Sequence, residues 1–154
     1  MTKSFHFFVF GLLILTLTSS ASSQADAPPG AMKLLPRYIH KTERGIDTRV
    51  GSISKPDGLT IKYDIGRLAG QYANPYSKNE YVWYKEQIVG GQKVVCVLTK
   101  QKQIIATFTD SSANFFATVE TEEDVVDFLL MVLTFEAPES SPPSPRRRTR
   151  RTTP

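Results

Sequence analysis

The sequence predicts an α+β domain, in which a five- to six-stranded antiparallel meander sheet carries one C-terminal helix packed on it. Three observations support this prediction. Short β-rich runs fill the middle of the chain, turn residues separate them, and the hydrophobic period changes to that of a helix only after residue 120. A series of strands followed by a helix is typical of α+β proteins.

The first residues have the pattern of an export signal. Lys3 supplies a positive charge, residues 7–17 form an apolar stretch, and small residues follow. The stretch has about 11 residues, whereas a membrane-spanning helix needs about 20. We therefore expect a signal peptide over residues 1–23, a flexible linker over residues 24–31, and secretion or export to the periplasm.

Residues 32–136 have the length of one domain with a modest core. Pro36 divides residues 32–41, so this segment is expected to be irregular or to lie at an edge. The single cysteine of the chain, Cys96, cannot form an internal disulfide. Its apolar neighbours predict a buried and unreactive thiol.

A first hairpin is expected from strands at residues 49–54 and 59–65. The connecting Lys-Pro-Asp-Gly sequence has turn chemistry, because Pro56 fixes φ and Gly58 accepts a positive φ. In the second strand, apolar and polar residues alternate, which is typical of a half-buried antiparallel strand. Its buried face is expected to consist of Leu59, Ile61, Tyr63 and Ile65.

A loop rich in Gly, Asn and Pro follows, and four more β-rich runs come after it. The dipeptide Gly90-Gly91 joins the first two of these runs and suits a tight hairpin turn. The last two runs continue the meander. Their expected ranges are 80–89, 92–100, 103–110 and 113–120.

The helix is expected to begin after Thr121. Thr121 and Asp124 have the spacing of a capping box, and acidic residues fill the first turn. The helix is apolar on most sides, which predicts that it is covered on more than one side. In the alternative of a structural or oligomerising protein, Val126, Leu130 and Met131 would form the apolar surface that a second copy of the chain covers in a homodimer.

Residues 137–154 form a Pro-, Ser- and Arg-rich tail that is predicted to be disordered. The formal charge of the chain is +4, but residues 28–145 contain 13 basic against 14 acidic residues. A nearly neutral body argues against dedicated nucleic-acid binding. We expect a solubility tail, or contact with an anionic envelope polymer, through Arg146, Arg147, Arg148, Arg150 and Arg151.

The sequence contains few groups suited to catalysis. Apart from His6 in the signal, His40 is the only histidine, and it is expected to lie at the surface or at an edge. One histidine and one cysteine do not make a zinc site, and no nucleotide-binding glycine pattern is present. Asp64 and Glu86 are candidates for a pair of catalytic carboxylates, but both fall on the polar sides of their strands, as solvated charges do. We therefore predict a protein that is not an enzyme and uses no metal or cofactor.

Aromatic residues are concentrated in the middle of the chain, with an arginine among them. Such side chains suit the binding of a protein or small-molecule partner. The predicted function is a small exported binding or accessory domain that uses an aromatic-rich sheet face and loop. The alternatives are a structural or oligomerising envelope protein and an enzyme without a short motif. The predicted binding residues are Tyr63, Arg67, Tyr72, Tyr76, Trp83 and Tyr84.

Overall fold

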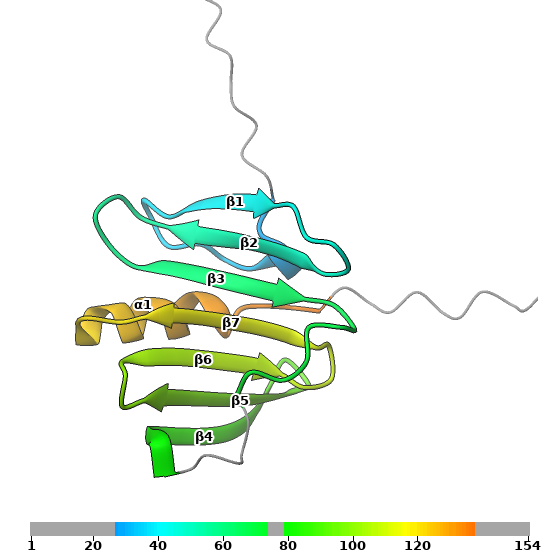
Figure 1. Ribbon diagram of the computed structural model, residues 1–154. Coiled ribbons are helices and arrows are strands. Elements are labelled where there is room, and N and C mark those ends of the chain that lie inside the picture. The colour runs from blue at the N-terminus through cyan, green and yellow to red at the C-terminus, as the bar shows by residue number, and fades with distance from the viewer. Residues whose placement is uncertain (1–26, 74–78, 138–154) are drawn as a thin grey trace, which may run out of the picture.

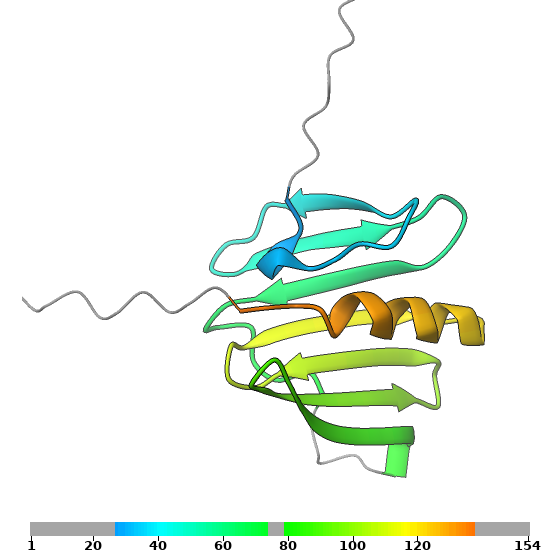
Figure 2. The same ribbon diagram turned by 180° about the vertical axis from the view of Figure 1, so that it is seen from behind.

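The structure is a computed structural model that describes residues 27–73 and 79–137. In these residues, one antiparallel sheet carries a single α-helix, α1 (Glu122–Val132), on one face (Figures 1 and 2). The α+β class is therefore confirmed. The sheet has seven strands rather than the five or six expected: β1 (Ile39–Glu43), β2 (Arg49–Ser54), β3 (Thr60–Ile65), β4 (Tyr81–Val89), β5 (Gln92–Thr99), β6 (Gln103–Phe108) and β7 (Ala113–Thr118).

The additional strand is β1, which lies at one edge of the sheet. Its sequence gave little sign of a strand, because its single buried position is occupied by His40 while Ile39 is exposed. Without apolar residues at every second position, no period of two is visible. His40 is thus at an edge, as expected, but it is buried rather than on the surface.

The strand order is β1-β2-β3-β7-β6-β5-β4, so the sheet is not one continuous meander. Two meanders meet where β3 pairs with β7, and the connection after β3 carries the chain to the opposite edge (Figure 1). At this junction Tyr63 lies opposite Phe115, and their rings are 6.2 Å apart. The burial of such side chains against each other joins the two meanders. Turn residues in the sequence do not reveal this pairing, because it is not between strands that follow each other along the chain.

The main core lies between the sheet and α1. Phe135, just beyond the helix, contacts Phe108 and Phe115 edge-to-face at 4.9 and 5.1 Å between ring centroids. These aromatic rings and Phe128 are fully buried. The segment before β1 lies on the same sheet face as the helix (Figure 2). The predicted buried face of β3, from Leu59 to Ile65, is confirmed as part of this core.

The ends of the domain also meet. Residues Pro29–Ala31, which belong to the predicted linker, form a short 3₁₀ turn, and Pro29 is buried. The backbone N–H of Glu136 donates a hydrogen bond to the carbonyl of Gly30 at 2.9 Å. Gly30 has a φ of 55°, and a Cβ atom there would collide with the carbonyl of Glu136. This position therefore requires glycine.

Two predicted turns have different outcomes. Gly90 and Gly91 both have positive φ values, 55° and 79°, as a tight hairpin turn of this type requires. In the β2–β3 turn, however, the residue with positive φ is Asp57, at 53°, and not Gly58. Gly58 instead leaves room for the side chain of Lys55, which a Cβ atom would contact too closely.

The capping box of α1 is confirmed. Thr121 Oγ1 accepts a hydrogen bond from the N–H of Asp124 at 3.1 Å, and Asp124 accepts one from the N–H of Thr121 at 3.0 Å. Within the described residues, part of the apolar surface of α1 is left open to solvent. Val126 and Leu130 are 52% and 56% exposed, while Met131 is fully buried against the sheet.

Cys96 is buried, as predicted, and this desolvation raises the pKa of its thiol to about 11. No helix in the described ranges is long and apolar enough to span a membrane. The predicted signal peptide, residues 24–26 of the linker and residues 138–154 of the tail lie outside the described residues.

Candidate functional site

The sheet face opposite α1, which we call the open face, is crossed by the connection that follows β3 (Figure 1). Two buried polar side chains hold this connection in place. Asn114 Oδ1 accepts a hydrogen bond from the N–H of Tyr72 at 3.1 Å, and Thr107 Oγ1 accepts one from the N–H of Ala73 at 2.9 Å. Because Thr107 also donates to Asn114 at 2.8 Å, the connection is fixed to β6 and β7 together.

A second, smaller apolar cluster lies beneath this connection on the open face. Ala73, Val97 and Ile105 are among its buried members. Three aromatic side chains, two from β4 and one from β7, pack around it at its margin. They are Tyr81, Tyr84 and Phe116.

The sheet separates the six residues that were predicted to form one binding surface. Tyr63 is buried on the helix side, where its hydroxyl lies 2.8 Å from His40 Nε2. Tyr72 and Tyr84 lie on the open face. Trp83 faces the helix side, because it pairs with Leu98, whose side chain packs on the main core. Arg67 is exposed in the connection after β3, and Tyr76 lies outside the described residues.

A β-bulge interrupts the alternation of side chains between the two faces along β4. The register shifts between Tyr81 and Trp83, so Tyr81 joins Tyr84 rather than Trp83 on one face. The rings of Tyr81 and Tyr84 are stacked with centroids 6.2 Å apart. Because a bulge adds one residue to the strand, every residue before it lies on the opposite face from the one that simple alternation predicts. The sequence alone does not indicate where a bulge occurs.

Tyr72 forms the second aromatic pair of the open face. Its ring lies 5.4 Å from that of Phe116, and its hydroxyl donates to Asp64 Oδ2 at 2.7 Å. This hydrogen bond, together with partial burial, raises the pKa of Tyr72. The side chain is 40% exposed, so an apolar ring surface remains in contact with solvent.

Phe116 also lines a groove of about 780 Å³, which we call the open-face groove. The groove lies between the β2–β3 turn, the start of β3, the end of β7, the residues just before α1 and the first turn of α1, so it extends from the open face around the end of the sheet. Polar side chains from neighbouring strands reach it beside the aromatic ring. These are Lys62 of β3, Gln103 of β6 and Thr118 of β7.

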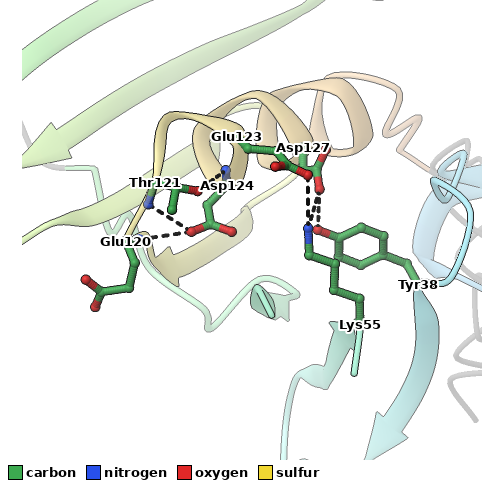
Figure 3. A network of polar contacts seen from close by, with 7 residues as sticks. All are labelled: Tyr38, Lys55, Glu120, Thr121, Glu123, Asp124 and Asp127. Carbon is green, nitrogen blue, oxygen red and sulfur yellow. Dashed lines mark hydrogen bonds and ion pairs between the residues drawn. The ribbon is translucent and has the colours of Figure 1, made fainter. Parts of the chain in front are cut away.

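One wall of the groove carries a network of charged groups that joins α1 to the β2–β3 turn (Figure 3). Asp127 Oδ2 accepts hydrogen bonds from Lys55 Nζ at 2.9 Å and from the hydroxyl of Tyr38 at 2.7 Å. Glu123 lies 3.7 Å from the same Lys55 nitrogen. We call Tyr38, Lys55 and Asp127 the helix latch. Tyr38 lies just before β1, Lys55 lies just after β2, and both attach to α1 through Asp127.

The latch determines the pKa values of its members. Partial desolvation alone would raise the pKa of Asp127, but the hydrogen bonds from Lys55 and Tyr38 outweigh it and lower the pKa. Burial and the bond to Asp127 raise the pKa of Tyr38 to about 12. The bond to Asp127 also raises the pKa of Lys55. Near neutral pH the network therefore holds a fixed ion pair and a neutral phenol.

The structure does not bring Asp64 and Glu86 together. Asp64 lies on β3 and Glu86 on β4, and three strands of the sheet lie between them. Glu86 instead forms an ion pair with Lys93 at 2.6 Å. In residues 27–73 and 79–137, no group of three or more His, Cys, Asp or Glu side chains is arranged to hold a metal ion.

The residues of the groove and of the latch were not among those predicted from the sequence. Lys55 stands directly before the Pro-Asp-Gly turn, and Asp127 is an acidic residue in an otherwise apolar helical segment. The single charge of Asp127 on such a segment is the one sequence signal from which a paired side chain elsewhere in the chain could have been predicted. The identity of that partner depends on the strand order.

Comparisons with known proteins show no similarity. No family model matches the chain, and no characterised protein or solved structure resembles it significantly.

Proposed function

We propose that this chain is a small exported binding domain, without catalytic activity, that takes a protein or small-molecule partner on the open face of its sheet. The open-face groove supports this proposal most directly. Its volume of about 780 Å³ lies within the range of about 300–1,000 Å³ that is typical of ligand sites. Polar groups beside an aromatic wall suit a partner with both apolar and polar parts.

The rigidity of the open face also supports binding. Tyr72 donates hydrogen bonds to Asn114 from its backbone N–H and to Asp64 from its hydroxyl, and these bonds hold its ring against Phe116 of the groove wall. Side chains that are fixed before a partner arrives lose little conformational entropy when it binds. The export part of the proposal rests on residues 1–23, and an additional contact with an anionic polymer rests on the five arginines of residues 146–151.

The test is to block the groove without disturbing the core. Thr118 is exposed at the groove wall, so Thr118→Arg should fill the groove and leave the fold intact. The matched control is Thr42→Arg, the same change at an exposed threonine of β1. Wild-type protein and the control are expected to retain the same partner from the native extracellular or periplasmic extract, and Thr118→Arg is expected to lose it. Equal retention by all three proteins would refute the groove as the site.

A second candidate function is self-assembly through α1. Val126 and Leu130 are more than half exposed and lie one helical turn apart. Met131, which was expected to join them, is buried and does not contribute. A dimer that survives dilution to nanomolar concentration, and that Leu130→Glu dissociates, would favour this candidate over a monomeric binding domain.

A further inference from the structure

The outer edge of β4 is a second surface with the properties of a binding site. β4 has nine residues, and it is the last strand in the order of the sheet. Within the described part of the chain, it pairs with β5 alone. An edge strand presents a row of backbone N–H and C=O groups, which is a template for another strand.

Apolar side chains accompany this edge on both faces of the sheet. Val82 is 66% exposed, Ile88 is 69% exposed and Trp83 is 36% exposed. Trp83 lies on the helix side, and Ile88 lies on the open face opposite Lys93. A strand added here would bury apolar surface above and below the sheet as well as pairing its backbone.

The charges of β4 disfavour a second copy of the chain as the occupant. Two copies that pair antiparallel through β4 are related by a twofold axis perpendicular to the sheet, and residues directly opposite each other share a face. Lys85 and Glu86 lie on opposite faces, so they cannot be opposite each other. Full overlap of the two strands would instead place Lys85 opposite its own copy.

Other registers of self-pairing are also poor. Moving the axis by one residue places Glu86 opposite its own copy, and like charges directly opposite each other are destabilising. Moving it further toward Val89 shortens the paired segment. Moving it toward Tyr81 brings in the irregular pairing at the bulge. We therefore expect the edge of β4 to pair with a strand of different sequence more readily than with β4 of a second copy.

The same charges indicate the chemistry of that strand. Glu86 is already compensated by Lys93, with 2.6 Å between Lys93 Nζ and Glu86 Oε1. Lys85 is exposed and forms no ion pair among residues 27–73 and 79–137. A partner with an acidic residue opposite Lys85 and apolar residues on either side would complement this edge.

We propose that β4 binds an extended segment of another protein by strand addition, with an acidic side chain of that segment opposite Lys85. Backbone hydrogen bonds supply the affinity in this mode, and side chains on alternate faces supply the specificity. The surface is separate from the open-face groove, so the two proposals stand or fall independently.

A synthetic peptide tests this proposal on the full-length protein. The peptide TVTKEIVTT, with both ends blocked, places Glu opposite Lys85, Lys opposite Glu86 and valines opposite Trp83 and Ile88 when it pairs antiparallel. Two derivatives carry N-methyl groups on alternate backbone nitrogens, at even or at odd positions. Amide chemical shifts of the protein are followed by NMR as each peptide is added.

Strand addition predicts that the shifts centre on β4 and β5 and that only one derivative binds, because amides of alternate residues point toward β4 or away from it. Lys85→Glu should weaken binding about ten-fold, and the peptide with its Glu replaced by Lys should recover it. Lys41→Glu, the same change on β1, should have no effect.

Three results would overturn the proposal: binding of both methylated derivatives, shifts centred away from β4, and no binding at millimolar peptide. A dimer of the chain formed through β4, detected by light scattering, would show instead that a second copy is the occupant. None of these results bears on Thr118→Arg, so failure here is distinguishable from failure of the groove.

Discussion

β1 and β4 are the two edge strands of one sheet, yet different contacts hold them to it. The segment that leads into β1 is attached to α1 by the bond from Tyr38 to Asp127, and His40 contacts Tyr63 of β3. β4 is attached mainly to its hairpin partner β5, through backbone pairing and the Lys93–Glu86 ion pair. One edge thus depends on residues distant in the sequence, and the other on its immediate neighbour.

This difference has a physical origin. β1 contains almost no apolar residue that faces the core, so polar contacts to other elements take the place of hydrophobic burial. β4 and β5 are rich in β-branched and aromatic residues and share a tight turn, so their pairing is formed locally. A strand fixed in this way keeps its outer edge available for a partner.

The largest effect is expected from a cavity midway between the two edges. Phe115 is fully buried on β7 and contacts Phe108 and Phe135. Phe115→Ala should lower the free energy of unfolding by about 3–5 kcal/mol, and hydrogen exchange should speed up at β1 and β4 alike. Phe116→Ala, on the other face of the same strand, is the control and should cost less in urea unfolding. Loss of protection at one edge alone would contradict a shared core.

An intermediate effect, confined to β1, is expected from the helix latch. Asp127→Asn removes the carboxylate that binds Lys55 and Tyr38, and should lower the melting temperature by roughly 5 °C. Hydrogen exchange should speed up around β1 and stay unchanged at β4. Equal acceleration at both edges would show that the latch stabilises the whole domain rather than one edge.

The latch also predicts how stability depends on pH. Because the pKa of Asp127 is lowered in the folded state, its contribution is complete above about pH 4 and is lost as the pH falls through the lowered value. The pKa of Tyr38 is raised to about 12, so its contribution is present below about pH 10 and is lost as the pH rises toward 12. In Asp127→Asn, the free energy of unfolding should fall less than in the wild-type protein as the pH is lowered below about 4.

The smallest effect is expected at the exposed apolar residues of the two edges. Ile88 of β4 and Ile39 of β1 are 69% and 61% exposed. Ile88→Lys and Ile39→Lys should each change the free energy of unfolding by no more than about 0.5 kcal/mol. A larger loss for Ile88→Lys in urea unfolding would mean that this side chain stabilises the domain itself and is not available to a partner.

Sequence reasoning located most of the elements but not how they are joined. Six strands, the Gly90-Gly91 turn and the Thr121 cap follow from local chemistry, and all are present. The pairing of β3 with β7 depends on contacts between residues more than 40 positions apart. The position of β1 depends on a buried histidine that carries no hydrophobic signal.

The candidate site was less accessible to such reasoning. The aromatic residues are close together in the sequence and were predicted to form one binding surface. The sheet instead places Tyr63 and Trp83 on one face and Tyr72 and Tyr84 on the other. A bulge and a long connection decide these faces, and both are properties of the folded chain. The groove is formed by residues 55–62 together with residues 103–124, which are distant in the sequence. No local sequence pattern therefore predicts it.

The hydrogen bond between Glu136 and Gly30 has a practical consequence for experiments on this domain. Because the first and last described segments touch, a donor dye near residue 27 and an acceptor dye near residue 137 would give strong energy transfer in the native state. Unfolding would move the dyes apart to the much larger mean end-to-end distance of an expanded, disordered chain. Such a labelled protein would report global opening through a single optical signal, leaving both the groove and β4 unmodified.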